Sequence, residues 1–433
     1  MNAAIDRYFK ITERRSTIGT EVRAGVVSFF AMAYIILLNP LILGTSEDSA
    51  GTTLGIPQVA AATALVAGVM TIAFGVIARY PFAMAAGLGM NTFVAVTMVS
   101  LNGLEWREAM GLVVIEGIII VLLAISGFRQ AVFDAIPASM KAAMGVGIGM
   151  FIALIGFVDG HFVTRVPDAA NTTVPVGLGI NGSISTWPAF VFIVGLILSS
   201  FFVIRQVRGG LFIGIVLTTI IAMIIQAFTG SEEWGMATPE VPDSLGGIPD
   251  LSIVGQVDPI SAFTKLGVVS TVLLIFTLLL TNFFDAMGTM NGLGKQADLV
   301  DEKGNLPDMK TALVVEGVGA VAGGAGSVSS NTVFADSAAG IGDGARTGFA
   351  NVVTGVIFLL AMFLTPLYEI VPIEAAAPVL VIVGVMMAAQ LKDIEWTRME
   401  QAIPAFLTIV VMPFTYSIAN GIGVGFIAYA LMA

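Results

Sequence analysis

The sequence predicts an all-α polytopic membrane protein with fourteen transmembrane segments in two inverted seven-segment repeats. Three observations lead to this fold class. The 433 residues are 57% hydrophobic and only 11% charged, whereas a soluble domain carries about 25% charged residues. Apolar segments near spanning length recur along the whole chain. The basic residues alternate between the two sides of those segments in a regular way.

Fourteen apolar segments are found, and several are shorter than the roughly 20 residues that a full span needs. Short segments suggest half-helices, or helices packed inside a bundle. The first segment is of spanning length and lacks a cleavage site, so we expect a retained first helix rather than a signal peptide. The segments lie at residues 21–43, 58–78, 82–100, 109–128, 140–158, 186–204, 210–229, 264–290, 310–325, 328–342, 347–366, 376–391, 402–415 and 419–432.

The basic residues predict the orientation of the chain. Sixteen of the nineteen Lys and Arg residues fall on one side of the predicted crossings, and only Arg107, Arg165 and Lys265 fall on the other. By the positive-inside rule both termini are cytoplasmic, and the protein lies in the cell membrane. The stretch 230–263 contains several acidic residues and no Lys or Arg. We interpret it as an external loop that divides the chain into two halves of seven segments.

Composition also excludes several classes of function. The net charge of −11 comes without a basic patch, so no nucleic-acid partner is expected. The chain has no cysteine, which excludes disulfides, thiol catalysis and Cys-ligated metals. The one histidine, His161, rules out a His-cluster metal site, and its predicted place in an external loop favours a solvated surface residue. We therefore expect no metal or other cofactor and no enzyme activity.

The two halves resemble each other weakly at their third segments. Segment 3 begins with Tyr80-Pro-Phe-Ala-Met-Ala-Ala-Gly-Leu-Gly-Met-Asn91, and segment 10 contains Asn331-Thr-Val-Phe-Ala-Asp-Ser-Ala-Ala-Gly-Ile-Gly342. Each is an extended-looking run followed by small residues, glycines and an apolar helix. Because seven is odd, the second half enters the membrane inverted. Paired interrupted segments of this kind point to the binding site of a transporter.

Segment 10 is a polar break inside an apolar chain. Val328–Phe334 is rich in β-branched and hydroxyl residues and predicts a short strand, which turns into a half-helix near Asp336, a good N-cap type. The strand edge from Phe334 through Ala335 offers backbone groups to a flat ligand, and Phe334 offers an aromatic face. An acidic residue at membrane depth indicates a functional site. The alternative is a re-entrant loop that packs two helices, with Asp336 only capping.

Segment 8 contains a second intramembrane carboxylate. Asn282, Asp285 and Thr289 follow i, i+3, i+7 spacing and so share one helix face. A desolvated carboxyl group that can hold a proton has the property that a proton carrier needs. The alternative is a structural hydrogen bond between helices.

Segment 3 supplies close backbone approach and one amide. The small residues from Ala83 to Gly89, among them Ala85 and Ala86, let backbone approach a ligand or a neighbouring helix. Asn91 adds a polar side chain just inside the following helix. Close helix packing is the alternative here. Glu116 and Glu316 are further intramembrane acids, which we interpret as supporting or gating groups.

Two carboxylates, Asp285 and Asp336, are thus expected to face one cavity. Such a pair does not easily hold two negative charges in a low dielectric, so we expect one shared or carried proton. Carboxylates beside backbone edges suit a planar heterocycle with N–H donors and suit an inorganic anion poorly.

At these residues the chain resembles the nucleobase–cation symporters, and among them the AzgA-like hypoxanthine/adenine/guanine permeases. The resemblance covers nearly the whole chain. It rests on Glu21-Val-Arg-Ala-Gly-Val-Val-Ser-Phe-Phe-Ala-Met-Ala-Tyr-Ile-Ile-Leu-Leu-Asn-Pro40, Gly87-Leu-Gly-Met-Asn91, Phe284-Asp-Ala-Met-Gly-Thr289 and Ser337-Ala-Ala-Gly-Ile-Gly-Asp-Gly-Ala-Arg-Thr-Gly348. Together these motifs are specific, although each alone is weak.

The resemblance implies a core domain that moves against a gate domain in elevator fashion. The core would comprise 1–128 and 264–366, and the gate 129–263 and 367–433. Substrate would lie between segments 3 and 10, beside segment 8, with Asp285 meeting substrate or proton and Phe334 on the aromatic wall. The implied partners are a purine nucleobase (adenine, guanine or hypoxanthine), a proton and the lipid bilayer, and a homodimer is compatible with the family.

Two positions depart from the family pattern. Asp336 stands where the family usually has glutamate, and Ala86 stands where it usually has proline. The shorter acid would leave a gap of about one bond length to the base, or a bridging water, so the preferred base stays open. Two alternatives remain: a uracil, xanthine or urate carrier, and an anion exchanger or channel of the same architecture. Against the latter, Asp336 occupies the half-helix N-terminus that would otherwise bind an anion.

Overall fold

The computed structural model describes residues 2–127, 136–165, 176–179, 182–230, 244, 246–301, 306–368 and 370–432. Its contacts divide the chain into two compact units, each made from two stretches of sequence. Unit 1 comprises residues 1–136 and 246–365, and unit 2 comprises residues 137–245 and 366–433. Each unit therefore combines helices from both halves of the chain.

Within the described residues, eight helices are long and apolar enough to cross a membrane by length and composition. Four shorter apolar helices lie at 88–101, 348–364, 399–414 and 420–432. The chain is thus a multi-pass helical membrane protein. The eight candidate spans are Ile18–Leu43, Ile56–Ile77, Trp106–Ser126, Ala138–Asp159, Trp187–Ile204, Gly210–Thr229, Val268–Gln296 and Ile373–Asp393.

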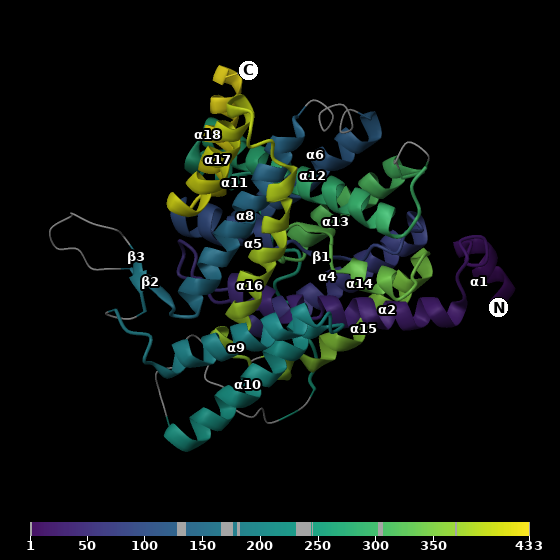
Figure 1. The fold of residues 1–433 in the computed structure, drawn as a ribbon, viewed down its shortest axis with the longest axis horizontal. Helices are drawn as coiled ribbons and strands as arrows, with labels where there is room; N and C mark the ends of the chain where they lie inside the picture. The colour runs from purple at the N-terminus through teal and green to yellow at the C-terminus, as the bar shows by residue number, and fades with distance from the viewer. Residues whose placement is uncertain are drawn as a thin grey trace. The chain divides into compact units, whose positions relative to one another are not determined.

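Unit 1 interleaves early and late segments of the chain, as the purple and green ribbons of Figure 1 show. Helix α4 packs on α15, α6 on α13 and α2 on α15. Its elements are α1 (Asn2–Phe9), α2 (Ile18–Met32), α3 (Ile35–Leu43), α4 (Ile56–Ile77), β1 (Met84–Ala86), α5 (Leu88–Thr92), a π-helix (Phe93–Leu101), α6 (Trp106–Ser126), α11 (Ser261–Leu266), α12 (Val268–Gln296), α13 (Met309–Ala325), β4 (Asn331–Val333), α14 (Ser337–Gly342), α15 (Gly348–Ala361) and a 3₁₀ helix (Met362–Leu367).

Local sequence explains where the unit 1 helices begin and end. Thr17 accepts a hydrogen bond from the N–H of Thr20 and so caps α2. Glu105 and Glu108 form a reciprocal capping box at the start of α6, and Gly127 ends that helix in a left-handed conformation. The first span breaks between α2 and α3, at Ala33 and Tyr34, before the Asn39-Pro40 pair.

Glycines allow the unit 1 helices to pack backbone against backbone. A Cβ atom at Gly68 would lie 2.9 Å from the carbonyl oxygen of Gly355, so α4 and α15 approach too closely for a side chain there. Likewise, a Cβ at Gly117 of α6 would lie 2.5 Å from the backbone nitrogen of Val321 in α13. Small residues at such interfaces are how membrane helices associate when burial in lipid offers no hydrophobic gain.

Unit 2 packs α16 against α8 and α9, and α17 against both α8 and α18. A Cβ at Gly156 would lie 2.8 Å from the carbonyl oxygen of Ala377, so α8 and α16 are also in backbone contact. Strands β2 and β3 pair antiparallel, and the sequence does not predict them. The elements are α8 (Ala138–Asp159), β2 (Val163–Arg165), β3 (Val176–Leu178), α9 (Trp187–Ile204), α10 (Gly210–Thr229), α16 (Ile373–Ala388), a 3₁₀ helix (Ala389–Asp393), α17 (Met399–Phe414) and α18 (Ile418–Met432).

Candidate functional site

Two short strands meet inside unit 1. Strands β1 and β4 pair antiparallel, with Ala85 opposite Thr332 and Ala86 opposite Asn331. Two further backbone bonds flank the pair: the N–H of Phe334 donates to the carbonyl of Ala83 (2.9 Å), and the N–H of Gly87 donates to the carbonyl of Ser330 (3.1 Å). The strands satisfy much of each other's backbone, which is what non-helical chain at membrane depth requires.

Neighbouring helices hold the strand pair from both ends. The hydroxyl of Thr71 on α4 donates to the carbonyl oxygen of Met84 and accepts from its N–H, both at 2.9 Å. The N–H of Ala83 donates to the hydroxyl of Ser337 (2.9 Å). On α15, the amide of Asn351 donates to the carbonyl of Phe82 (2.6 Å). Both backbone groups of Ala83 are therefore engaged within the protein, and its role is to fix the pair.

Replacing Thr71 by valine should destabilise the protein by about 2–4 kcal/mol, because it leaves the buried N–H and carbonyl of Met84 without their partner. Thermal unfolding of the purified protein measures the loss. Thr277→Val is the matched control, since the hydroxyl of Thr277 donates only to the carbonyl of Leu273 in its own helix. Equal stability of both variants would contradict the anchoring role of Thr71.

Asp336 lies where β4 passes into α14. Its carboxylate accepts a hydrogen bond from the hydroxyl of Tyr34 (2.9 Å), which comes from the break between α2 and α3. The Phe334 ring lies 6.1 Å from the Tyr34 ring. Asp336 occupies the N-cap position of α14, but its side chain makes no capping hydrogen bond. The half-helix thus begins at Asp336 as expected, but the alternative in which this residue only caps the helix is not supported, because its carboxylate accepts from Tyr34 instead.

Helix α12 brings the second carboxylate to the same region. This helix spans Val268–Gln296 and contacts both β4 and α14. Asn282, Asp285 and Thr289 all belong to it. The acid that interacts electrostatically with Asp285 is Glu316 on α13, and Glu316 itself accepts from the hydroxyl of Thr332 in β4 (3.3 Å).

The exposure of the predicted residues is uneven. Ala335 is exposed, and Asp285, Thr289 and Asp336 are partly exposed. Their neighbours Phe334, Ala83, Ala85 and Ala86 are buried. Ala335 and the two carboxylates are therefore more accessible than the strands that lie beside them.

Asn91 is fully buried in α5, and neither its amide nitrogen nor its amide oxygen has a hydrogen-bond partner among the described residues. A buried amide without partners is costly, and an unmet donor and acceptor need a ligand or water. Asn331 in β4 is in the same condition, but its Cβ packs on Gly323 of α13. The segment that follows Asn91 continues as a π-helix from Phe93 to Leu101, a form that occurs often at functional sites.

Some residues of this arrangement were missed by sequence reasoning. Tyr34 and Thr71 lie inside apolar helices far from the strands in sequence, and only the fold brings them to Asp336 and Met84. A single hydroxyl within an apolar segment was the one available signal.

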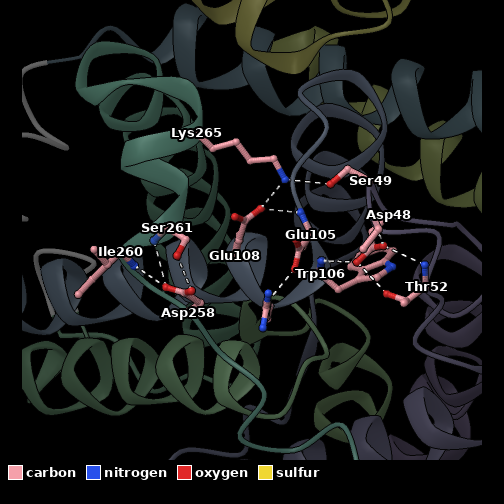
Figure 2. Close-up of polar contacts among 12 residues, drawn as sticks. Asp48, Ser49, Thr52, Glu105, Trp106, Glu108, Asp258, Ile260, Ser261 and Lys265 are labelled. Atoms are coloured by element: carbon pink, nitrogen blue, oxygen red, sulfur yellow. Dashed lines mark hydrogen bonds and ion pairs between the residues drawn. The ribbon is translucent and has the colours of Figure 1, made fainter.

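Unit 1 also carries a separate polar network on the side predicted to be external, shown in Figure 2. The ammonium of Lys265 on α11 donates to Glu108 (3.0 Å) and to Ser49 (2.9 Å), and the N–H of Trp106 donates to Asp48 (3.1 Å). Burial opposes ionisation of Asp48, but hydrogen bonds from Thr52 and Trp106 outweigh it and lower the pKa of that carboxyl. The network ties the start of α6 to the segment that leads into α12.

A cavity of about 330 Å³ opens beside this network. None of the predicted site residues lines it, so it is distinct from the strand region. Its lining residues are Asp48, Ala50, Thr52, Leu54, Glu105, Trp106, Arg107, Ser252, Ile253 and Gln256.

In unit 2, His161 is paired rather than freely solvated. It follows the end of α8, its side chain is 36% exposed, and its Nε2 lies 3.5 Å from the carboxylate of the fully buried Glu374 on α16. The hydrogen bond with Glu374 raises the pKa of His161, burial opposes this, and the charges of Glu374 and Asp159 add to the rise.

The stability of the protein should accordingly fall as pH rises. The folded-state pKa of His161 lies above its unfolded value, so the stabilisation is complete below about pH 6.5 and is lost as pH passes through the raised pKa. Thermal unfolding of the wild type and of His161→Gln, compared from about pH 5.5 to about pH 8.5, isolates this effect. A difference between the two proteins that does not shrink as pH rises would contradict it.

The apolar helices define a multi-pass membrane protein, with an antiparallel strand pair inside unit 1. The chain belongs to the permease family described by the model Xan_ur_permease, which matches residues 19–424. This confirms the family resemblance seen in the sequence. Relatives with curated names match over nearly the whole chain.

Two bacterial relatives show the extent of the match. The guanine/hypoxanthine permease PbuG of Bacillus subtilis (strain 168) is 37% identical over 431 residues, covering 98% of this chain and 92% of that protein. The adenine permease AdeQ of Escherichia coli (strain K12) is 33% identical over 432 residues, covering 100% of this chain and 91% of that protein.

Among solved structures, the transmembrane domain of the cyanobacterial bicarbonate transporter BicA superposes with a TM-score of 0.66. The match covers 94% of this chain and 97% of that one, at 15% sequence identity. At this identity the likeness concerns the fold alone.

Proposed function

We propose that this protein is a proton-coupled secondary active transporter that imports purine nucleobases into the cell. The observation that carries the proposal is the strand pair with the Tyr34–Asp336 contact and the Phe334 ring at the end of β4. The names of the relatives, guanine/hypoxanthine and adenine permeases, support a purine base as the substrate.

In this proposal the base lies beside β4, between the strand pair and α12. Phe334 stacks on the flat ring. Asp336, oriented by Tyr34, accepts a ring N–H. Asn91 offers both an unmet donor and an unmet acceptor, which complement the alternating edge of a purine. Thr289 on α12, together with the backbone of Ala85, Ala86 and Ala335, completes the contacts.

Proton coupling is assigned to Asp285 and Asp336. Asp285 lies on α12 and Asp336 stands at the start of α14, two helices that contact each other, and we assign the transported proton to this pair. A ligand that accepts or displaces that proton would link its own movement to the proton gradient.

We further propose that unit 1 is the core domain and unit 2 the gate domain of an elevator mechanism. Each unit has its own close helix packing, and the described site residues all belong to unit 1. The proposal includes fourteen crossings in the cell membrane with both termini in the cytoplasm, since most basic residues fall on that side.

Uptake of labelled hypoxanthine and adenine into cells that express the protein tests this function. Saturable uptake that is abolished by collapsing the proton gradient is expected. Uptake that continues at the same rate after the proton gradient is collapsed would overturn proton coupling. Excess unlabelled uracil, xanthine, urate or bicarbonate in the same assay should compete poorly, and strong competition by one of them would assign that substrate instead.

A further inference from the structure

One fully buried carboxylate of unit 1 has no role in the mechanism above. Glu116 of α6 accepts a hydrogen bond at Oε1 from the amide nitrogen of Asn282 (2.8 Å) and at Oε2 from the hydroxyl of Ser330 (3.2 Å). The same amide nitrogen also donates to the Ser330 hydroxyl (2.9 Å). Three side chains from three separate segments therefore form a closed triad.

The backbone that carries Glu116 is tightly fixed. Its neighbour Gly117 packs on the backbone of Val321, and a Cβ at Gly324 of α13 would lie 2.9 Å from the backbone nitrogen of Val114. Because α6 and α13 touch through backbone, α6 cannot readily slide or rotate. Glu116 is thus a fixed point for the groups that bond to it.

Those groups lead directly to the proposed ligand contacts. Asn282 lies one helical turn before Asp285 on α12. Ser330 directly precedes β4, and its carbonyl accepts the N–H of Gly87 at the end of the strand pair. One carboxylate therefore holds both α12, through Asn282, and the strand pair, through Ser330. We call these hydrogen bonds among Glu116, Asn282 and Ser330 the brace.

The Asn282 amide depends on this contact for its orientation. Its Oδ1 is buried and has no hydrogen-bond partner among the described residues. Only the nitrogen is held, by Glu116 and Ser330. Without Glu116, the Asn282 amide nitrogen keeps only its bond to the Ser330 hydroxyl. A hydroxyl can both donate and accept, so it would not fix which end of the amide faces it.

We propose that Glu116 is a positioning residue of the transport site, which holds Asn282 and Ser330 so that α12 and β4 present their groups to the ligand together. This inference rests on the proposed function for the identity of the ligand. The brace itself can be measured without any ligand.

The experiment uses the full-length purified protein, with hypoxanthine as the probe. Glu116→Ala should raise the Kd by about tenfold or more, whereas Glu116→Gln should stay within about threefold of wild type. Glutamine can still accept from Asn282 and can donate to the Ser330 hydroxyl. Asn282→Ala should match Glu116→Ala, and the double variant should be no worse than either, since the three groups act as one unit.

A ligand-free readout accompanies the binding measurement. Hydrogen exchange of the Gly87 amide should accelerate in Glu116→Ala and remain slow in Glu116→Gln, because the brace holds its acceptor. Thr281→Val serves as the control for both readouts. Its hydroxyl donates only to the carbonyl of Thr277 in the same helix (2.8 Å), so both values should stay at wild-type levels.

Three results would overturn the proposal. A wild-type Kd in Glu116→Ala would remove the positioning role, and additive effects in the double variant would separate Glu116 from Asn282. A raised Kd with unchanged exchange at Gly87 would make Glu116 a direct ligand contact. If the wild type binds no purine base, the proposed function fails, and exchange at Gly87 alone then decides whether the brace exists.

Discussion

Asp336→Asn should lower the uptake of purine base by roughly 100-fold. In the proposed site this carboxylate accepts a ring N–H of the base, and a hydrogen bond to a charged group contributes about 1.5–3 kcal/mol. Asparagine is nearly isosteric but turns one acceptor oxygen into a donor. The new amide N–H would face one of two other donors, either the ligand N–H or the Tyr34 hydroxyl, which donates to Asp336 in the wild type. Two donors facing each other cannot form a hydrogen bond.

Tyr34→Phe should lower uptake less, by about tenfold, because it removes only the group that orients the carboxylate. The double variant should be no worse than Asp336→Asn alone, since Tyr34 acts through Asp336. Initial rates of labelled hypoxanthine uptake, normalised to the amount of protein in the membrane, measure each effect.

Asp298→Asn is the matched control for this series. Asp298 is exposed after α12 and has a φ of 56°, a conformation that asparagine adopts readily. Its uptake should equal that of the wild type. Wild-type uptake in a well-expressed Asp336→Asn variant would remove Asp336 from the site.

Gly75→Ala should destabilise the protein by about 3 kcal/mol and lower Tm by about 5 °C. The added Cβ would lie 2.7 Å from the Cβ of Asn351 and would also press on the carbonyl of Gly348. Neither neighbour is the flexible end of a long side chain, so α4 and α15 must separate. The shift should reach the site as well, because Asn351 holds the carbonyl of Phe82 just before β1.

Gly19→Ala is the control for this substitution. Gly19 lies in α2 of the same unit, and nothing stands within 4 Å of a Cβ placed there. Alanine favours a helix by about 1 kcal/mol over glycine, so this variant should unfold at or slightly above the wild-type temperature. If both variants unfold at the same temperature, backbone contact between α4 and α15 is not what limits stability.

The position of strand β4 could be predicted from the sequence because polarity stands out in an apolar chain. The run from Val328 to Asp336 and the acid at Asp285 were visible for this reason, and strand β4 lies within the expected run. The partner of Asp336 could not be predicted. Tyr34 looks like an ordinary aromatic residue of an apolar helix, and its meaning depends on the break between α2 and α3.

Other features escaped prediction because short-range patterns do not specify them. The π-helix at Phe93–Leu101 is apolar apart from Thr97 and Ser100, so no hydrophobic periodicity distinguishes it from an α-helix. Strands β2 and β3 are three residues each, too short to give an alternating pattern. His161 appeared to be a surface residue, since its partner Glu374 lies in another segment of the chain.

The strand pair has a consequence for how the protein is made. Ala86 and Asn331, which lie opposite each other, are more than half the chain apart in sequence. During synthesis β1 is therefore made long before β4, and its backbone lacks its strand partner until β4 has left the ribosome. Thr71, whose hydroxyl bonds both backbone groups of Met84, can protect part of β1 in the meantime because it belongs to the preceding helix. Truncation before β4 should leave an insertion intermediate that quality-control proteases recognise.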